Sequence, residues 1–185
     1  MSPSLSPLAT MLSLNTDLLL NCLDGLSGET AVERLHGRGN SISFIAAHMI
    51  DARHFMARLL GSPLPNAIGE ALATARSIED APALPSLDCI RGEWTAISRH
   101  LEKLLKAPVQ PDLGQAAPQS FPIPDGSLLG GLCFLVQHDA FHLGQVALLR
   151  RQFGYEAMSY ARRVPFGGGE EAWPHPALPP CRRPG

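Results

Sequence analysis

The feature that most constrains this sequence is an apolar side chain at every third or fourth position, which recurs in four separate segments. The first begins at about Pro7, and the others cover residues 41–60, 87–106 and 128–153. This spacing gives a helix one hydrophobic face, which must be buried against another element. No segment alternates apolar and polar residues over six or more positions, and no Asn-Gly hairpin turn occurs. The sequence therefore predicts an all-α four-helix bundle.

Residues that favour helix ends stand at the limits of these segments. A serine or asparagine before a helix can accept a hydrogen bond from one of its free backbone N–H groups. The expected N-terminal caps are Ser6, Asn40 or Ser41, Ser86 and Ser127. Glycine and proline, which end helices, follow the last three segments at Gly61, Pro108 and Gly154. One short helix is also expected between residues 27 and 40, and the proline-rich stretches before residues 87 and 128 are expected to be loops.

Length and composition limit the class of protein. A chain of 185 residues with 45% hydrophobic residues is expected to form one domain with a real core. The net charge of −2 and the lack of a basic stripe argue against a nucleic-acid partner. No uninterrupted apolar run approaches the roughly 20 residues that span a bilayer, and the N-terminus lacks a basic leader. A cytoplasmic protein with no membrane partner is expected.

The C-terminal residues differ in composition from the rest. Residues 164–185 are rich in glycine and proline, so we expect an irregular tail after a bundle domain of residues 1–163. The four cysteines are Cys22, Cys89, Cys133 and Cys181. No two have the C-x-x-C spacing of a thiolate metal site or redox pair, so free thiols are expected.

Two histidines interrupt the apolar face of the last segment. Leu135, His138, His142, Gln145 and Leu149 advance by three or four residues and therefore share one face of a helix. The leucines at either end direct this face toward the core, so the polar residues between them are expected to be buried too. A buried polar group without a partner costs roughly 1–3 kcal/mol. His48 raises the same question, because it lies in the apolar stripe of residues 41–60.

A metal ion would satisfy all three histidines. Imidazoles at positions i and i+4 of a helix can converge on one ion, and His48 from a facing helix would complete a set of three ligands. Three protein ligands leave a coordination position open, which is typical of catalytic rather than structural sites. Gln145 is expected to orient a ligand ring or reach a bound substrate. Asp139 is a further candidate acceptor for a ligand ring, although an acid at this position more often faces solvent.

Other interpretations of the histidines remain open. An H-x-x-x-H pair also occurs on solvated helix faces, and a single histidine such as His48 often makes ordinary hydrogen bonds in or beside a core. His100 lies at core-facing spacing in the third segment and is a reserve ligand. His54 is expected to point to solvent. His36 and His175 lie in loop-like sequence and are expected at the surface.

Two stretches resemble a known family. NSISFIAAHMIDARHFMARLLG is followed about 90 residues later by HDAFHLGQVALLRRQFG. A Ser-Ile helix start, a single histidine with a following Asp-Ala-Arg, and a later H-x-x-x-H-x-G-Q are similar to the pattern of the DinB/YfiT-like proteins. The matching positions are Ser41-Ile42, His48, Asp51-Ala52-Arg53, His138, His142, Gly144 and Gln145.

The resemblance implies a four-helix bundle in up-down-down-up order, with a divalent metal, often zinc or nickel, held by His48, His138 and His142. It also implies a homodimer, and a small-molecule substrate for which a low-molecular-weight thiol is one candidate. Family members include thiol-dependent transferases that use bacillithiol or mycothiol. The functional hypothesis is a metal-dependent S-transferase or hydrolase. The alternatives are a non-catalytic metal- or small-ligand-binding stress-response bundle, and an ion or hydrogen-bond network that only fills a polar hole in the core.

Overall fold

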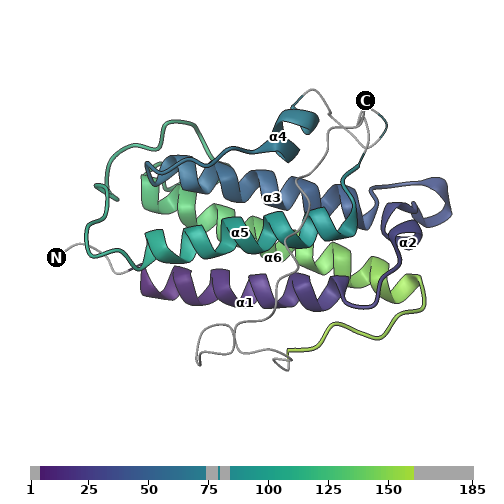
Figure 1. The fold of residues 1–185 in the computed structure, drawn as a ribbon. Coiled ribbons are helices and arrows are strands. Elements are labelled where there is room, and N and C mark those ends of the chain that lie inside the picture. The colour runs from purple at the N-terminus through teal and green to yellow at the C-terminus, as the bar shows by residue number, and fades with distance from the viewer. Residues whose placement is uncertain (1–4, 74–78, 80–83, 161–185) are drawn as a thin grey trace.

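The computed structural model describes residues 5–73, 79 and 84–160, and four long helices dominate it (Figure 1). Within the described residues there is no strand, only one isolated bridge between Ala116 and Ser127. The predicted all-α fold is confirmed. The long helices are α1 (Ser6–Leu23), α3 (Ile42–Leu59), α5 (Leu87–Leu105) and α6 (Leu128–Gln152). The connections hold α2 (Gly28–Val32), the 3-10 turn η1 (Leu35–Gly37) and α4 (Ala67–Leu72).

The four long helices pack in a ring. Both α1 and α3 contact both α5 and α6. Asn15 donates to the carbonyl of Val136 and Arg150 donates to the carbonyl of Cys22, so α1 and α6 advance in the same direction. Figure 1 shows α3 and α5 running the opposite way. As a result, α3 and α6 are antiparallel neighbours, and the middle of one lies beside the middle of the other.

Side-chain caps fix the starts of three long helices as the sequence predicts. Ser41, Ser86 and Ser127 each accept a hydrogen bond from the backbone N–H three residues later. The prediction for Ser6 is wrong, because α1 begins at Ser6 itself. Its N-cap is Leu5, which makes no side-chain cap bond and is buried. The apolar contact of Leu5 with the core therefore replaces a polar cap at this end.

The connection after α3 contains a helix that the sequence does not reveal. α4 spans only six residues, too few for an apolar period to appear, and Asn66 caps it by accepting from the N–H of Gly69. The amide of Asn66 also donates to Asp51 at 2.7 Å. This bond holds α4 against the middle of α3.

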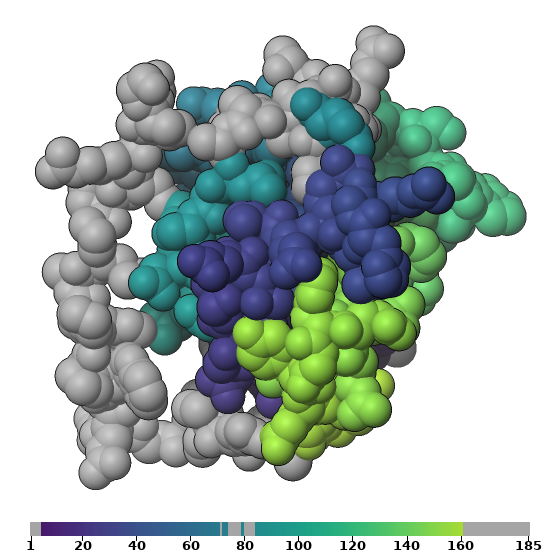
Figure 2. All heavy atoms as spheres, turned by 90° about the vertical axis from the view of Figure 1, so that its right-hand side faces the viewer, coloured from purple at the N-terminus to yellow at the C-terminus, as the bar shows by residue number. Residues whose placement is uncertain are grey.

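The residues after α6 cover one end of the bundle (Figure 2). The guanidinium of Arg150 donates to the carbonyls of Cys22 and Asp24, and the N–H of Ser159 donates to the side chain of Asn21. Arg150 therefore joins the end of α6 to the C-terminal end of α1, and Ser159 ties the residues after α6 to the same end. The expected boundary at residue 164 and the irregular tail beyond it lie outside the described residues.

One further expectation needs correction. Cys22 and Cys133 are free thiols, as expected, but Cys89 forms a disulfide bond. By length and composition, α6 is a helix that could cross a membrane, although its apolar run is interrupted by polar residues. It packs against α1 and α3, and the core helix of a soluble protein meets the same criterion.

Candidate metal centre

Three imidazoles from two helices meet on one side of the bundle. His138 and His142 lie one turn apart on α6, and His48 faces them from α3. Because the two helices are antiparallel, residues in their middles can approach closely. His138 and His142 are half-buried and His48 is exposed. The prediction that His48 lies in a buried stripe is therefore wrong, since the centre sits at the rim of the core and opens to the surface.

The ring nitrogens are close enough to share an ion. Nε2 of His138 lies 3.0 Å from Nε2 of His48 and 3.0 Å from Nε2 of His142. One ligand atom from each ring lies within 4.8 Å of the other two. Two nitrogens at 2.0–2.1 Å from a tetrahedral ion would be about 3.3 Å apart. Small side-chain adjustments would therefore complete a three-nitrogen site.

Hydrogen bonding alone is a poor account of this arrangement. Each ring nitrogen of a neutral imidazole carries either one proton or one lone pair. Nε2 of His138 faces two other ring nitrogens, so it can make at most one well-formed hydrogen bond and leaves the other contact unsatisfied. Three lone pairs directed at a common cation leave no such conflict. The donor set therefore fits a divalent metal that accepts nitrogen ligands.

Gln145 contacts the ring of His142 on the side away from this centre. The Nδ1–H of His142 donates to Oε1 of Gln145 at 2.7 Å. When Nδ1 carries the proton, the lone pair of the neutral ring lies on Nε2, the nitrogen that points toward His138. Gln145 thus favours the tautomer that a metal ligand requires, and it also restricts the ring's orientation.

The surroundings of His138 and His48 favour the neutral form of their rings. Burial, followed by the neighbouring rings of His142 and His48, lowers the pKa of His138 to about 4. Desolvation by the protein atoms around the ring and the adjacent His142 also lower the pKa of His48, although part of its side chain is exposed, while Asp51 opposes this shift. Only a neutral imidazole has a lone pair to give to a metal. His138 therefore keeps its lone pair well below neutral pH, and the lowered pKa of His48 acts in the same direction.

Asp139 points into the core, and the expectation of an exposed acid is wrong. It is 1% exposed and forms an ion pair with Arg53 of α3 at 2.8 Å. Arg53 is 0% exposed, also donates to Thr16 and Ser98, and lies 3.5 Å from the centre of the Trp94 ring. The bonds of Asp139 therefore join α6 to α3 directly behind the three histidines.

Sequence reasoning missed this buried ion pair. Arg53 follows His48 by five residues and Asp139 follows His138 by one, so each charge lies on a different face of its helix from the histidine. The signal that could have found the pair is a charged residue on each of two helices that are otherwise apolar around most of their circumference.

The other histidines lie away from the centre. His54 is 2% exposed, so the expected solvent position is wrong. The reserve ligand, His100, places its Nε2 2.8 Å from the carbonyl oxygen of Ser62 and is not part of the triad. His36 lies in η1, and His175 lies outside the described residues.

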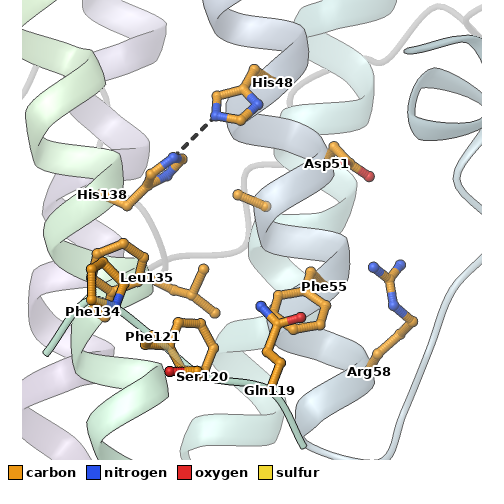
Figure 3. Close-up of a pocket in the computed structure, with 12 residues that line it drawn as sticks. His48, Asp51, Phe55, Arg58, Gln119, Ser120, Phe121, Phe134, Leu135 and His138 are labelled. Atoms are coloured by element: carbon orange, nitrogen blue, oxygen red, sulfur yellow. Dashed lines mark hydrogen bonds between the residues drawn. The ribbon is translucent and has the colours of Figure 1, made fainter. Parts of the chain in front are cut away.

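A surface pocket of about 280 Å³ begins at His48 and His138 (Figure 3). Aromatic rings line its middle, and Phe121 lies 5.5 Å from Phe134 between ring centres. Phe121 belongs to the loop before α6 and can lie against that helix because residue 131 is glycine. A Cβ there would be 2.5 Å from the Phe121 ring. The loop thus supplies one wall of the pocket.

Comparison with known proteins identifies the family. No curated protein matches the chain. The family model of the DinB superfamily matches residues 11–146, a span that includes all three histidines and Gln145. That match covers most of the sequence, with all of α3 and α5 and most of α1 and α6. On this match, together with the helical fold, the chain belongs to the DinB superfamily.

Proposed function

We propose that this protein is a divalent-metal-dependent enzyme, in which His48, His138 and His142 hold one zinc or nickel ion. The observation that carries the proposal is the approach of three Nε2 atoms, with two separations of 3.0 Å. Three protein ligands leave room for a substrate or water. When bound, the metal would act as a Lewis acid and lower the pKa of a coordinated thiol or water.

The residues of this chain support that chemistry in separate ways. The three ligands are neutral imidazoles, so the set does not cancel the ion's double positive charge, and a coordinated group loses its proton more readily. Gln145 holds the ring of His142 in the ligating tautomer. The aromatic wall formed by Phe121 and Phe134 provides an apolar surface beside the site, which excludes water from one side of a bound substrate.

The proposed reaction is transfer of a low-molecular-weight thiol to a small electrophile, or hydrolysis by the same metal-assisted route. An opening beside the ligands favours a reacting site over an ion that merely fills the core, since His48 is exposed and the pocket reaches it. We propose a cytoplasmic location, where such thiols are kept reduced; the disulfide bond of Cys89 would then be an exception to the usual scarcity of disulfides in that compartment.

Metal analysis tests the proposal directly. Wild-type protein loaded with zinc or nickel and desalted should retain one ion per chain. His138→Ala and His142→Ala should lose it, whereas His100→Ala should retain it, because His100 is a helix histidine that bonds to Ser62 instead. Equal retention by all four proteins, or by none, would remove the basis of the proposal.

Activity is tested on the loaded protein. Conjugation of several bacterial thiols to small electrophiles, and hydrolysis of an ester panel, should show turnover that a chelator and His142→Ala abolish. Full occupancy without turnover would instead favour the non-catalytic binding bundle.

We also propose a homodimer that uses the exposed side of α6. Phe141 and Leu148 are 60% and 59% exposed and lie seven residues apart, on one face of the helix. Large apolar side chains grouped in this way are typical of subunit contacts. Sedimentation should give a dimer for the wild type and a monomer for Leu148→Glu. Val109→Glu, at a position 85% exposed in a loop, should remain dimeric. A wild-type monomer would contradict the proposal.

A further inference from the structure

The pocket beside the histidines has three chemically different parts. His48 and His138 form one end, and the rings of Phe55, Phe121 and Phe134 line the middle (Figure 3). At the other end the side chains are polar: Arg58 comes from α3 and Gln119 from the loop before α6. A ligand that fills this pocket therefore meets ligating nitrogens, then apolar surface, then a cation and an amide.

Arg58 is available to bind an anion. It is exposed, and it takes part in none of the four ion pairs among the residues that the structure describes. Its guanidinium carbon lies 5.2 Å from the centre of the Phe55 ring, and this contact keeps the charge beside the aromatic wall. A guanidinium in this setting can donate two parallel hydrogen bonds to a carboxylate.

The one acidic side chain that lines the pocket, Asp51, points away from the rest of the pocket. Asp51 lies between His48 and Arg58 along α3, and its Oδ1 accepts a hydrogen bond from Asn66 at 2.7 Å. Figure 3 shows its carboxylate pointing away from His138 and the aromatic rings. The anion-binding end is thus left to Arg58 and Gln119.

We infer that the pocket binds a small organic anion with an aromatic or similarly apolar body, whose carboxylate pairs with Arg58 and whose reacting end faces the three histidines. The backbones of His48 and Arg58 are about 15 Å apart along the helix, but the arginine side chain extends toward the histidine end (Figure 3), so a ligand has a shorter span to bridge. The pocket volume of about 280 Å³ is at the small end of known ligand sites, which suits one ring with a short acidic side chain. This inference rests on the proposed metal site only for the position of the reacting end.

Calorimetric titration with 3-phenylpropionate and its neutral isostere, 3-phenylpropanamide, tests the inference. The zinc-loaded wild type should bind the acid at least about tenfold more tightly than the amide, as expected for a charged hydrogen bond. Arg58→Gln should weaken binding of the acid by a similar factor and leave binding of the amide unchanged. The control Arg99→Gln changes an exposed helix arginine that lies outside the pocket, and it should alter neither affinity.

Repeating the titrations after chelation separates the two proposals. A preference for the acid that depends on Arg58 and survives in protein that binds no metal would uphold this inference while the metal-enzyme proposal failed. If binding of the acid requires the metal but is unchanged in Arg58→Gln, the carboxylate binds the ion itself and the inference is overturned. Equal or undetectable binding of acid and amide by the wild type would also overturn it.

Discussion

Replacing Asp139 by asparagine should destabilise the protein strongly, because it leaves a buried positive charge without its counterion. Arg53 is 0% exposed, and its Nε and Nη2 both lie 2.8 Å from Oδ2 of Asp139. Removing one partner of a buried ion pair typically costs about 3–5 kcal/mol. Asparagine can still accept one hydrogen bond, which places the expected loss near 3 kcal/mol. At roughly 2–4 °C per kcal/mol for a chain of this size, Tm should fall by at least about 6 °C.

Urea denaturation followed by circular dichroism measures this loss. The matched control is Asp88→Asn, which removes an acid that is 79% exposed and pairs with Arg91 at 3.3 Å. Exposed pairs contribute about 0–1 kcal/mol, so the control should stay within about 1 kcal/mol of the wild type. If Asp139→Asn were no less stable than Asp88→Asn, the buried pair would not stabilise the fold as argued here.

Three further predictions concern the site and its supports. In metal-free protein the pKa of His138 is lowered to about 4, so the unfolded chain binds a proton at this ring more tightly than the folded chain does. The free energy of unfolding should therefore fall as pH decreases from about 6.5 to 4. Urea midpoints should show a smaller fall over this range in His138→Gln. Gln145→Ala should weaken metal binding about 10–100-fold in chelator competition, because it removes the contact with His142. Gln137→Ala, at an exposed position on the same helix, should leave metal affinity unchanged. Equal effects of the two substitutions would exclude a role for the Gln145 contact. Gly131→Ala should cost about 1–3 kcal/mol in urea denaturation, since its Cβ would lie 2.5 Å from an aromatic ring carbon. Gly144→Ala, with nothing within 4 Å, should instead stabilise by about 0.5–1 kcal/mol, and a loss there would indicate a close partner.

The sequence predicted the long helices well because their signals are local. An apolar period over 18 or more residues, preceded by Ser41, Ser86 or Ser127, is read from neighbours along the chain. The start of α1 was misplaced because Leu5 is held by packing, which depends on the rest of the fold. The short helix α4 was missed because six residues show no apolar period, and its place on α3 depends on the Asn66–Asp51 bond and on burial of Ile68.

The grouping of His138, His142 and Gln145 was also predictable, because residues three and four apart share a helix face. How deeply these three side chains are buried was not predictable. The same spacing suits a stripe in the core and a stripe at its rim, and only the position of the neighbouring helix decides between them. His54 was misjudged for the same reason: α3 is buried over more of its circumference than one apolar stripe suggests.

The buried ion pair explains how a rim site keeps its geometry. His48 is exposed, so burial does not fix its position, yet Arg53 and Asp139 join the same two helices a few residues away. We expect this pair to set the position of α3 along α6, and hence the separation of the imidazoles. Replacing both charges by apolar residues, as Arg53→Met with Asp139→Leu, removes that constraint without leaving a lone charge.

The double variant therefore separates stability from site geometry. Thr16 and Ser98 lose Arg53 as a donor, but each hydroxyl still donates to a carbonyl of its own helix. Replacement of buried ion pairs by apolar residues is often neutral or stabilising, so urea denaturation should show little loss. Metal affinity, measured by chelator competition, should nevertheless fall, since α3 could then slide against α6. Wild-type affinity in a stable double variant would mean that core packing alone aligns the three histidines.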